Sequence, residues 1–283
     1  MAGNGGALPI ACRKGWPGWL LAVLVLSMPA KAHDFWVEPP LFQTEPGQTV
    51  PAMIWVGDHG ARERSPIQAR RIVALRSVGP GGVRDQLPGL ELGGVAADMH
   101  LLLTERGTHL LTLETDHAAI ALPADRFNTY LQQEGLTPAI AWRRERGQEG
   151  RPGREIYCRR AKVILQVGPL HPGSAGIVTQ ATGLNLEIVP EVHPGLLKQG
   201  QALPVRVLFD GVALAGAQVR LSDLTADGRP LDQQVTDHQG RARFAISRQG
   251  RWLLSVVWTK PIPDGIVADF ETRFASLSFA TGK

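Results

Sequence analysis

The sequence predicts a mostly β protein built from two β-sandwich-like domains, the first of which carries a short helical insertion. The 283 residues include 32 Gly and 21 Pro, which is typical of a chain with many turns. Short segments rich in apolar and β-branched residues recur between these turn signals, as expected for strands. With 43% apolar and 20% charged residues, the chain has the composition of a folded protein with a packed core.

The first 32 residues have the features of a secretory signal peptide. Arg13 and Lys14 precede an apolar stretch at residues 16–28, and an Ala-Lys-Ala triplet follows at residues 30–32. Signal peptidase requires small residues at the two alanine positions of such a triplet. The apolar stretch is shorter than the roughly 20 residues of a membrane-spanning helix. We therefore expect cleavage after Ala32, a periplasmic or secreted protein, and no membrane span in the mature chain; an uncleaved anchor is the alternative.

Removal of this leader changes the charge of the chain. Three basic residues and no acidic ones are lost, so the formal net charge falls from +4 to +1. The mature chain has no basic stripe with interleaved aromatic residues, which argues against a nucleic acid as partner. The arginines between residues 143 and 160 are interspersed with glutamates and indicate a solvated face. Cys158 is the one cysteine left after cleavage, so an intramolecular disulfide and a cysteine-based metal site are both excluded.

The first predicted domain, residues 33–170, consists mainly of strands. Residues 49–57 and 71–78 are rich in apolar and β-branched side chains and end in Gly or Pro signals. Residues 100–115 contain two short apolar segments around a Glu-Arg-Gly turn, which predicts a hairpin. Residues 153–168 return to the strand pattern and complete the domain.

The helical insertion lies near residues 124–146. Phe127, Tyr130 and Leu131 recur at helical spacing, and Gly135 follows at the position of a C-cap. A second short helix is expected after this glycine. The change from strand spacing to helical spacing is the reason for treating the segment as an insertion into a β domain.

Residues 169–176 are rich in Pro, Gly and Ser and are the expected linker to the second domain, residues 177–283. That domain contains strand-like segments at regular spacing with turn signals between them, which predicts an Ig-like β-sandwich. Asp210 and Gly211 form one of these signals, a dipeptide typical of a tight turn.

Cleavage after Ala32 would make His33 the first residue of the mature chain, with a free α-amine beside its imidazole. The reference pKa of an α-amine is about 7.7–8.0, against about 10.4 for lysine, so the amine is readily available as a ligand. The amine and Nδ1 can chelate one ion of nickel, cobalt or copper. Cleavage after Ala30 would instead place His33 third, which is the amino-terminal copper/nickel motif. The alternative is that His33 only begins an edge strand anchored by Phe35 and Trp36.

Three further histidines complete the predicted metal site. His59 lies in a loop just after a strand, where Asp58 could orient its imidazole. His109 lies in the predicted hairpin, and His117 stands beside acidic residues. For each of these three, a surface histidine or a hydrogen-bonded structural histidine is the alternative.

Catalytic motifs are absent from the sequence. The chain has no Gly-x-Ser-x-Gly nucleophile motif, no His-Glu-x-x-His zinc motif, and no Gly-rich phosphate loop between a strand and a helix. We therefore expect a binding protein rather than an enzyme. A copper enzyme that oxidises polysaccharide is an alternative, but it would require a flat, aromatic-lined surface around His33.

Several segments together resemble one bacterial family. They are "AHDFWVEPP" after the leader, "LPADRFNTYLQQEGL", "GREIYCRRAKVILQVG", "LPVRVLFDGVALAGAQV" and "FASLSF". The chain resembles, over essentially the whole mature length, a periplasmic family whose domain has no assigned function and whose members are often described as substrate-specific components of nickel uptake. The resemblance implies an Ig-like C-terminal part, an association with nickel or cobalt uptake, and a metal contact at His33.

The sequence therefore predicts a secreted periplasmic protein that binds nickel or cobalt, with copper as an alternative. His33 would hold the ion, aided by His59, His109 and His117, and the ion would be delivered to a membrane metal transporter. A structural or adhesive Ig-like surface protein that binds no metal is the rival interpretation.

Overall fold

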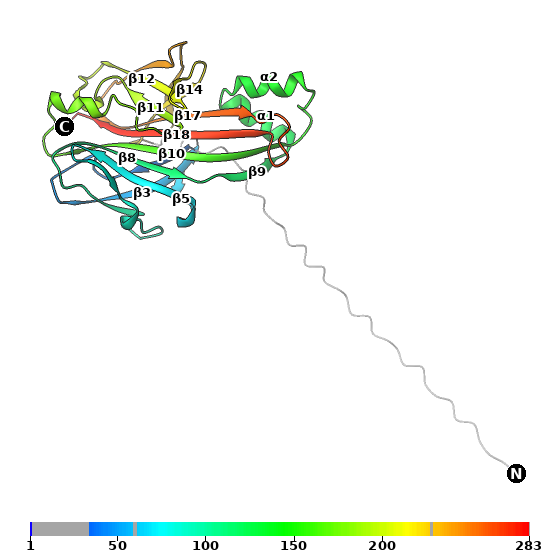
Figure 1. Ribbon diagram of the computed structural model, residues 1–283, viewed down its shortest axis with the longest axis horizontal. Coiled ribbons are helices and arrows are strands. Elements are labelled where there is room, and N and C mark those ends of the chain that lie inside the picture. The colour runs from blue at the N-terminus through cyan, green and yellow to red at the C-terminus, as the bar shows by residue number, and fades with distance from the viewer. Residues whose placement is uncertain (2–33, 59–60, 227–228, 283) are drawn as a thin grey trace. The chain divides into compact units, whose positions relative to one another are not determined.

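The computed structural model describes Met1 and residues 34–58, 61–226 and 229–282 (Figure 1). For Asp58, Ala61, Ser174 and Ala175 only the backbone is described. The predicted leader lies outside the described residues except for Met1. The unit Lys31–Lys283 is compact, and its described residues are mostly in strands, with two short α-helices. The predicted fold class is therefore confirmed.

A ten-stranded sheet runs through the middle of this unit. Its main path follows the order β15-β14-β17-β18-β10-β8-β5-β6, and β2 and β9 also pair with β10. The pairing of β10 with β18 is parallel, from Glu155 opposite Phe270 to Val163 opposite Ser278, and it joins strands of both predicted domains. The strands are β2 (Gln43–Thr44), β5 (Ile72–Gly79), β6 (Gly82–Asp85), β8 (Gly107–Thr115), β9 (Ala118–Leu122), β10 (Gly153–Val167), β14 (Gln218–Asp223), β15 (Pro230–Val235), β17 (Gly250–Pro261) and β18 (Phe270–Thr281).

Two smaller sheets cover the opposite faces of this central sheet (Figure 1). The N-terminal outer sheet contains β1 (Asp34–Glu38), β3 (Thr49–Asp58), β4 (Ala61–Arg64) and β7 (Met99–Leu102). The C-terminal outer sheet contains β11 (Leu186–Pro190), β12 (Ala202–Phe209), β13 (Val212–Ala213) and β16 (Arg241–Ala245).

The side chains of β10 show why the layers stack in this way. Successive residues of a strand point to opposite faces of the sheet. Val163 and Leu165 accordingly pack in one core with residues of β1, β3 and β7, whereas Ile164 packs in a second core with residues of β11, β12 and β16. A strand that is apolar on both faces is buried between two layers, so each outer sheet forms a sandwich with the central one.

The predicted helical insertion is confirmed as α1 (Ala124–Gln133) and α2 (Thr137–Glu145). Phe127, Tyr130 and Leu131 are buried on α1 and form a third core with residues of β17 and β18. Gly135 has a φ of 66°, and Leu136 N donates to the carbonyl of Leu131 at 2.8 Å, which ends α1. Within the described part of the chain, no helix is long and apolar enough to cross a membrane.

The predicted hairpin between residues 100 and 115 is wrong, although both of its strands exist. β7 pairs with β3 in the N-terminal outer sheet, and β8 pairs with β5 and β10 in the central sheet. β8 is buried along nearly its whole length, so it requires a neighbouring strand on each side and packing on both faces. The chain between the two strands therefore crosses from one layer to the next instead of turning back on itself.

The predicted linker contains one of four short 3-10 helices that the structure describes. These are η1 (Ala69–Arg71), η2 (Leu87–Gly89), η3 (Pro172–Ile177) and η4 (Pro194–Leu196). A domain boundary at η3 stays a prediction. The predicted Asp210-Gly211 turn does connect β12 to β13, and both residues have positive φ values, 51° and 79°, as a tight hairpin turn requires.

Candidate functional site

Two of the predicted metal ligands, His33 and His59, are sequence neighbours of residues at one end of the β1–β3 strand pair. β1 and β3 are antiparallel, with Asp34 opposite Gly57. His33 precedes Asp34, and His59 follows Asp58; both histidines lie outside the described residues. Asp34 and Asp58, the described chain neighbours of the two histidines, therefore lie at the same end of the pair.

A buried charge cluster fixes the start of β1. Arg220 on β14 places Nη2 3.4 Å from Asp34 Oδ1 and 2.5 Å from Glu134 Oε2, just beyond α1. Burial alone would lower the pKa of Arg220, but the two carboxylates raise it above its ordinary value, so the guanidinium stays charged. Phe35 and Trp36 are also buried, and they hold the next residues of β1 in the core. The residue that follows His33 therefore has a fixed position.

His109 is a structural histidine by its contacts. It lies on β8 with 5% of its surface exposed, and Nε2 donates to the carbonyl oxygen of Glu105 at 2.8 Å. The other side of the ring packs against Gly79, where an added Cβ would overlap the imidazole. His117 follows eight residues later, roughly 26 Å away along an extended chain. The structure therefore does not bring these two predicted ligands together.

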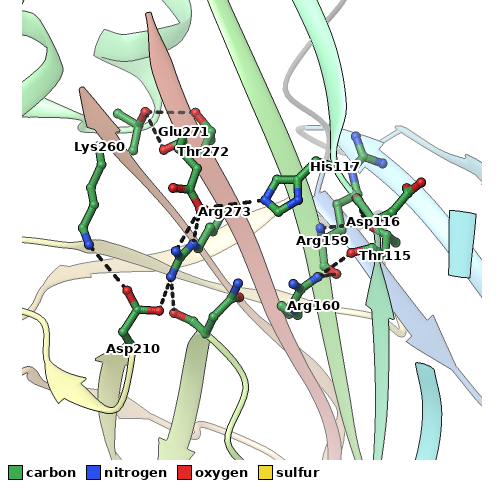
Figure 2. Close-up of polar contacts among 12 residues, drawn as sticks. Thr115, Asp116, His117, Arg159, Arg160, Asp210, Lys260, Glu271, Thr272 and Arg273 are labelled. Carbon is green, nitrogen blue, oxygen red and sulfur yellow. Dashed lines mark hydrogen bonds and ion pairs between the residues drawn. The ribbon is translucent and has the colours of Figure 1, made fainter. Parts of the chain in front are cut away.

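His117 begins a chain of polar contacts that continues through Glu271, Arg273, Asp210 and Lys260 (Figure 2). Nε2 lies 3.8 Å from Glu271 Oε1, and Glu271 also accepts from Nη2 and Nε of Arg273 at 2.8 and 2.9 Å. Arg273 contacts Asp210, which in turn lies 3.5 Å from Nζ of Lys260. Among the residues that the structure describes, His, Cys, Asp and Glu side chains form no group of three that could hold a metal ion.

His193 was not among the predicted metal ligands, but the fold buries it in a defined turn. Nδ1 accepts from the backbone N–H of Gly195 at 3.0 Å, and Nε2 lies 3.2 Å from Thr108 Oγ1. Burial lowers the pKa of His193 to about 4, so the ring is neutral at physiological pH. It lines a cavity of about 490 Å³ whose walls include Phe42, Ile164 and Leu196. The Pro that follows His193 was the available sequence signal for this capped turn.

The expectation of a solvated face for the arginines near residues 143–160 is wrong for two of them. Arg143 is 2% exposed and donates through Nη2 to the carbonyl of Arg151 at 2.6 Å. Arg160 is 6% exposed and donates through Nη1 to the carbonyl of Thr115 at 2.8 Å. Backbone carbonyl groups accept hydrogen bonds from both guanidinium groups inside the fold, a possibility that the spacing of Arg and Glu along the chain does not reveal.

A family model described as "Domain of unknown function (DUF4198)" matches residues 30–260. The chain belongs to the DUF4198 family. No curated protein is significantly similar to it.

Among solved structures, the chain is similar to the D0-D1 domain of intimin, with 13% identity, a TM-score of 0.20, and coverage of 86% of this chain and 96% of that one. It is also similar to a Salmonella alpha-2-macroglobulin mutant, with 13% identity, a TM-score of 0.22, and coverage of 88% of this chain and 15% of that one. A marsupial T cell receptor has 9% identity and a TM-score of 0.22, with coverage of 89% and 74%. These values support no statement about function.

Proposed function

We propose that this DUF4198 protein is a secreted periplasmic protein that binds a nickel or cobalt ion, with copper as the alternative, through His33. The bound ion would then pass to a membrane metal transporter. The observation that carries the proposal is the pairing of Asp34 with Gly57, because it brings the chain neighbours of His33 and His59 to one end of the N-terminal outer sheet.

The donor atoms suit these metals. After cleavage behind Ala32, His33 offers its α-amine and Nδ1, and His59 offers one imidazole nitrogen. Nitrogen ligands of this kind favour nickel, cobalt and copper over calcium or magnesium. The ion pair of Asp34 with Arg220 holds the start of β1 in place, which lowers the conformational cost of bringing the donors together.

The remaining two predicted ligands, His109 and His117, differ in their burial and in their contacts. His109 is buried and donates to a backbone carbonyl, so the proposal assigns it no metal. The side chain of His117 is 48% exposed and stays a candidate for an additional donor. Its contact with Glu271 is 3.8 Å long and partly exposed, and such contacts contribute little stability that a metal bond would have to replace.

The test uses the mature protein purified from the periplasm. Mass spectrometry should show that the chain begins at His33. Calorimetric titration with Ni(II), Co(II) and Cu(II) should give one tight site, and His33→Ala should abolish it. His238→Ala is the matched control, because His238 lies exposed in the turn between β15 and β16. Equal affinities in the wild type and His33→Ala would contradict the proposal.

One observation favours the rival function, an adhesive or structural surface protein. β15 is an edge strand of the central sheet, and Leu231 and Val235 on it are both 61% exposed. Apolar side chains on an edge strand favour the addition of a strand from a partner. This function predicts association that does not depend on metal and that Leu231→Lys weakens, whereas His33→Ala would leave it unchanged.

A further inference from the structure

A cavity of about 390 Å³ lies beside β3, β8 and β10. We call it the Arg159 cavity; its walls include Val56, Ile67, Arg70, Arg71, Tyr157 and Arg159. Glu63 also lines it, so three arginines face one carboxylate. Its positive charge and its apolar walls indicate a ligand that has both an anionic group and a carbon skeleton.

Arg159 is the reason to treat this cavity as a binding site. Its guanidinium lies 5.3 Å from the ring centre of Phe35, 5.4 Å from that of Tyr157 and 5.5 Å from that of Phe274. Nε is buried and has no hydrogen-bond partner among the described residues. The backbone N–H of Arg159 donates to Thr115 Oγ1 at 3.0 Å, which fixes the strand at this point (Figure 2).

Two other arginines near this cavity have acidic partners, whereas Arg159 has none among the described residues. Arg160 donates to a backbone carbonyl and lies 3.4 Å from Glu114, and Arg71 forms an ion pair with Asp116. Arg159 forms no ion pair with any residue that the structure describes, and aromatic rings surround it instead. The Arg159 side chain is half-buried and its Nε fully buried; because a guanidinium cannot lose its proton in a protein, the absence of an acidic partner here is unfavourable. Burial accordingly lowers the pKa of Arg159.

We propose that the Arg159 cavity binds a small organic acid, whose carboxylate pairs with the guanidinium of Arg159. The planar guanidinium matches a carboxylate with two parallel hydrogen bonds. Arg70 and Arg71 add positive charge, and Arg71 is already partly neutralised by Asp116. Val56 and Ile67 contact the carbon skeleton.

The geometry favours an organic acid over inorganic phosphate. A volume of about 390 Å³ exceeds the need of a single phosphate and falls in the range of small-molecule sites. Glu63 opposes the accumulation of several negative charges at one point, whereas an organic acid carries each charge on a separate carboxylate. The apolar side chains in the walls would gain nothing from a bare inorganic anion.

The experiment titrates the mature protein with succinate, and separately with inorganic phosphate, in buffer freed of metals by a chelating resin. Calorimetry should show one saturable succinate site and weaker binding of phosphate. Arg159→Met should weaken succinate binding about 10–100-fold, which is the loss expected for hydrogen bonds to a charged group. Arg84→Met is the matched control, because Arg84 lies exposed on β6 and pairs with Glu105; its affinity should stay within about twofold of the wild type.

Two further measurements distinguish a specific loss of binding from misfolding and from a simple loss of charge. Arg159→Met should melt at the wild-type temperature or above, because it removes a half-buried charge that has no acidic partner, so lost binding cannot be attributed to misfolding. Arg159→Lys keeps the charge but loses the two-bond geometry, and its affinity should lie between those of the wild type and Arg159→Met. Absence of saturation by succinate, tighter binding of phosphate than of succinate, or equal succinate affinity in Arg159→Met would each overturn the proposal.

Discussion

The ion pair between Lys162 and Glu187 offers the sharpest test of how the layers are held together. Lys162 on β10 and Glu187 on β11 connect the central sheet to the C-terminal outer sheet, with 2.6 Å between Nζ and Oε1. Both side chains are 1% exposed. Burial lowers the pKa of Lys162. Burial would raise the pKa of Glu187, but Lys162 and hydrogen bonds from Thr182 hold it below its ordinary value.

The expected cost of breaking the pair differs between its two partners. In Lys162→Met the carboxylate of Glu187 keeps donors from Thr182, Gly183 and Leu184, so the loss should be near about 3 kcal/mol, the lower end for a buried pair. In Glu187→Gln the ammonium of Lys162 loses its one acidic partner among the described residues, so the loss should be nearer about 5 kcal/mol.

Thermal unfolding measures these losses directly. For a chain of this size a loss of about 3 kcal/mol lowers the melting temperature by roughly 6–12 °C, and about 5 kcal/mol lowers it by roughly 10–20 °C. Replacement of both residues together should cost clearly less than the sum of the single losses, because no buried charge is left unpaired. Arg84→Met, at an exposed ion pair, should cost less than about 1 kcal/mol. If Lys162→Met costs no more than Arg84→Met, the stabilising role of the pair is refuted.

Three further predictions concern stability. Burial raises the pKa of Glu155 to about 7, so the folded chain keeps a proton that the unfolded chain releases near pH 4.5. The wild type should therefore lose about 3 kcal/mol of unfolding free energy relative to Glu155→Gln as the pH rises from 5 to 8. Urea unfolding measures this difference, and a difference that does not change with pH would contradict the prediction. Burial lowers the pKa of His193 to about 4, so the wild type should lose stability relative to His193→Gln as the pH falls from about 6.5 to 4, and parallel pH profiles would argue against it. Gly79→Ala should cost about 1–3 kcal/mol because its Cβ overlaps His109, whereas Gly150→Ala, with open space around it, should stay within about 0.5 kcal/mol; equal melting temperatures would refute the clash.

Local patterns predicted the elements well because each depends on neighbouring residues. The helical spacing of Phe127 and Tyr130 and the glycine after α1 suffice to place the insertion. The Asp210-Gly211 dipeptide suffices to place a turn, because two successive positive φ values are costly for most other residues.

Pairings between distant strands were not predictable in the same way. β10 pairs with β18 across more than a hundred residues, and nothing in either segment specifies the other as its neighbour. The same limit explains the wrong hairpin, since β7 and β8 are adjacent in the chain but belong to different layers. The sequence could name His33 and His59 as candidate ligands, but only the pairing of Asp34 with Gly57 shows that their chain neighbours meet.

The measurement that tests the central claim most directly compares two forms of the mature protein. One begins at His33, and the other carries a single Gly before His33, which keeps every side chain but removes the free amine from that residue. Calorimetric titration with Ni(II) should show that the added Gly weakens binding by at least about tenfold, because loss of a donor atom should cost no less than loss of a hydrogen-bond partner of a metal ligand. Equal Ni(II) affinity in the two forms would contradict metal binding through the N-terminal histidine.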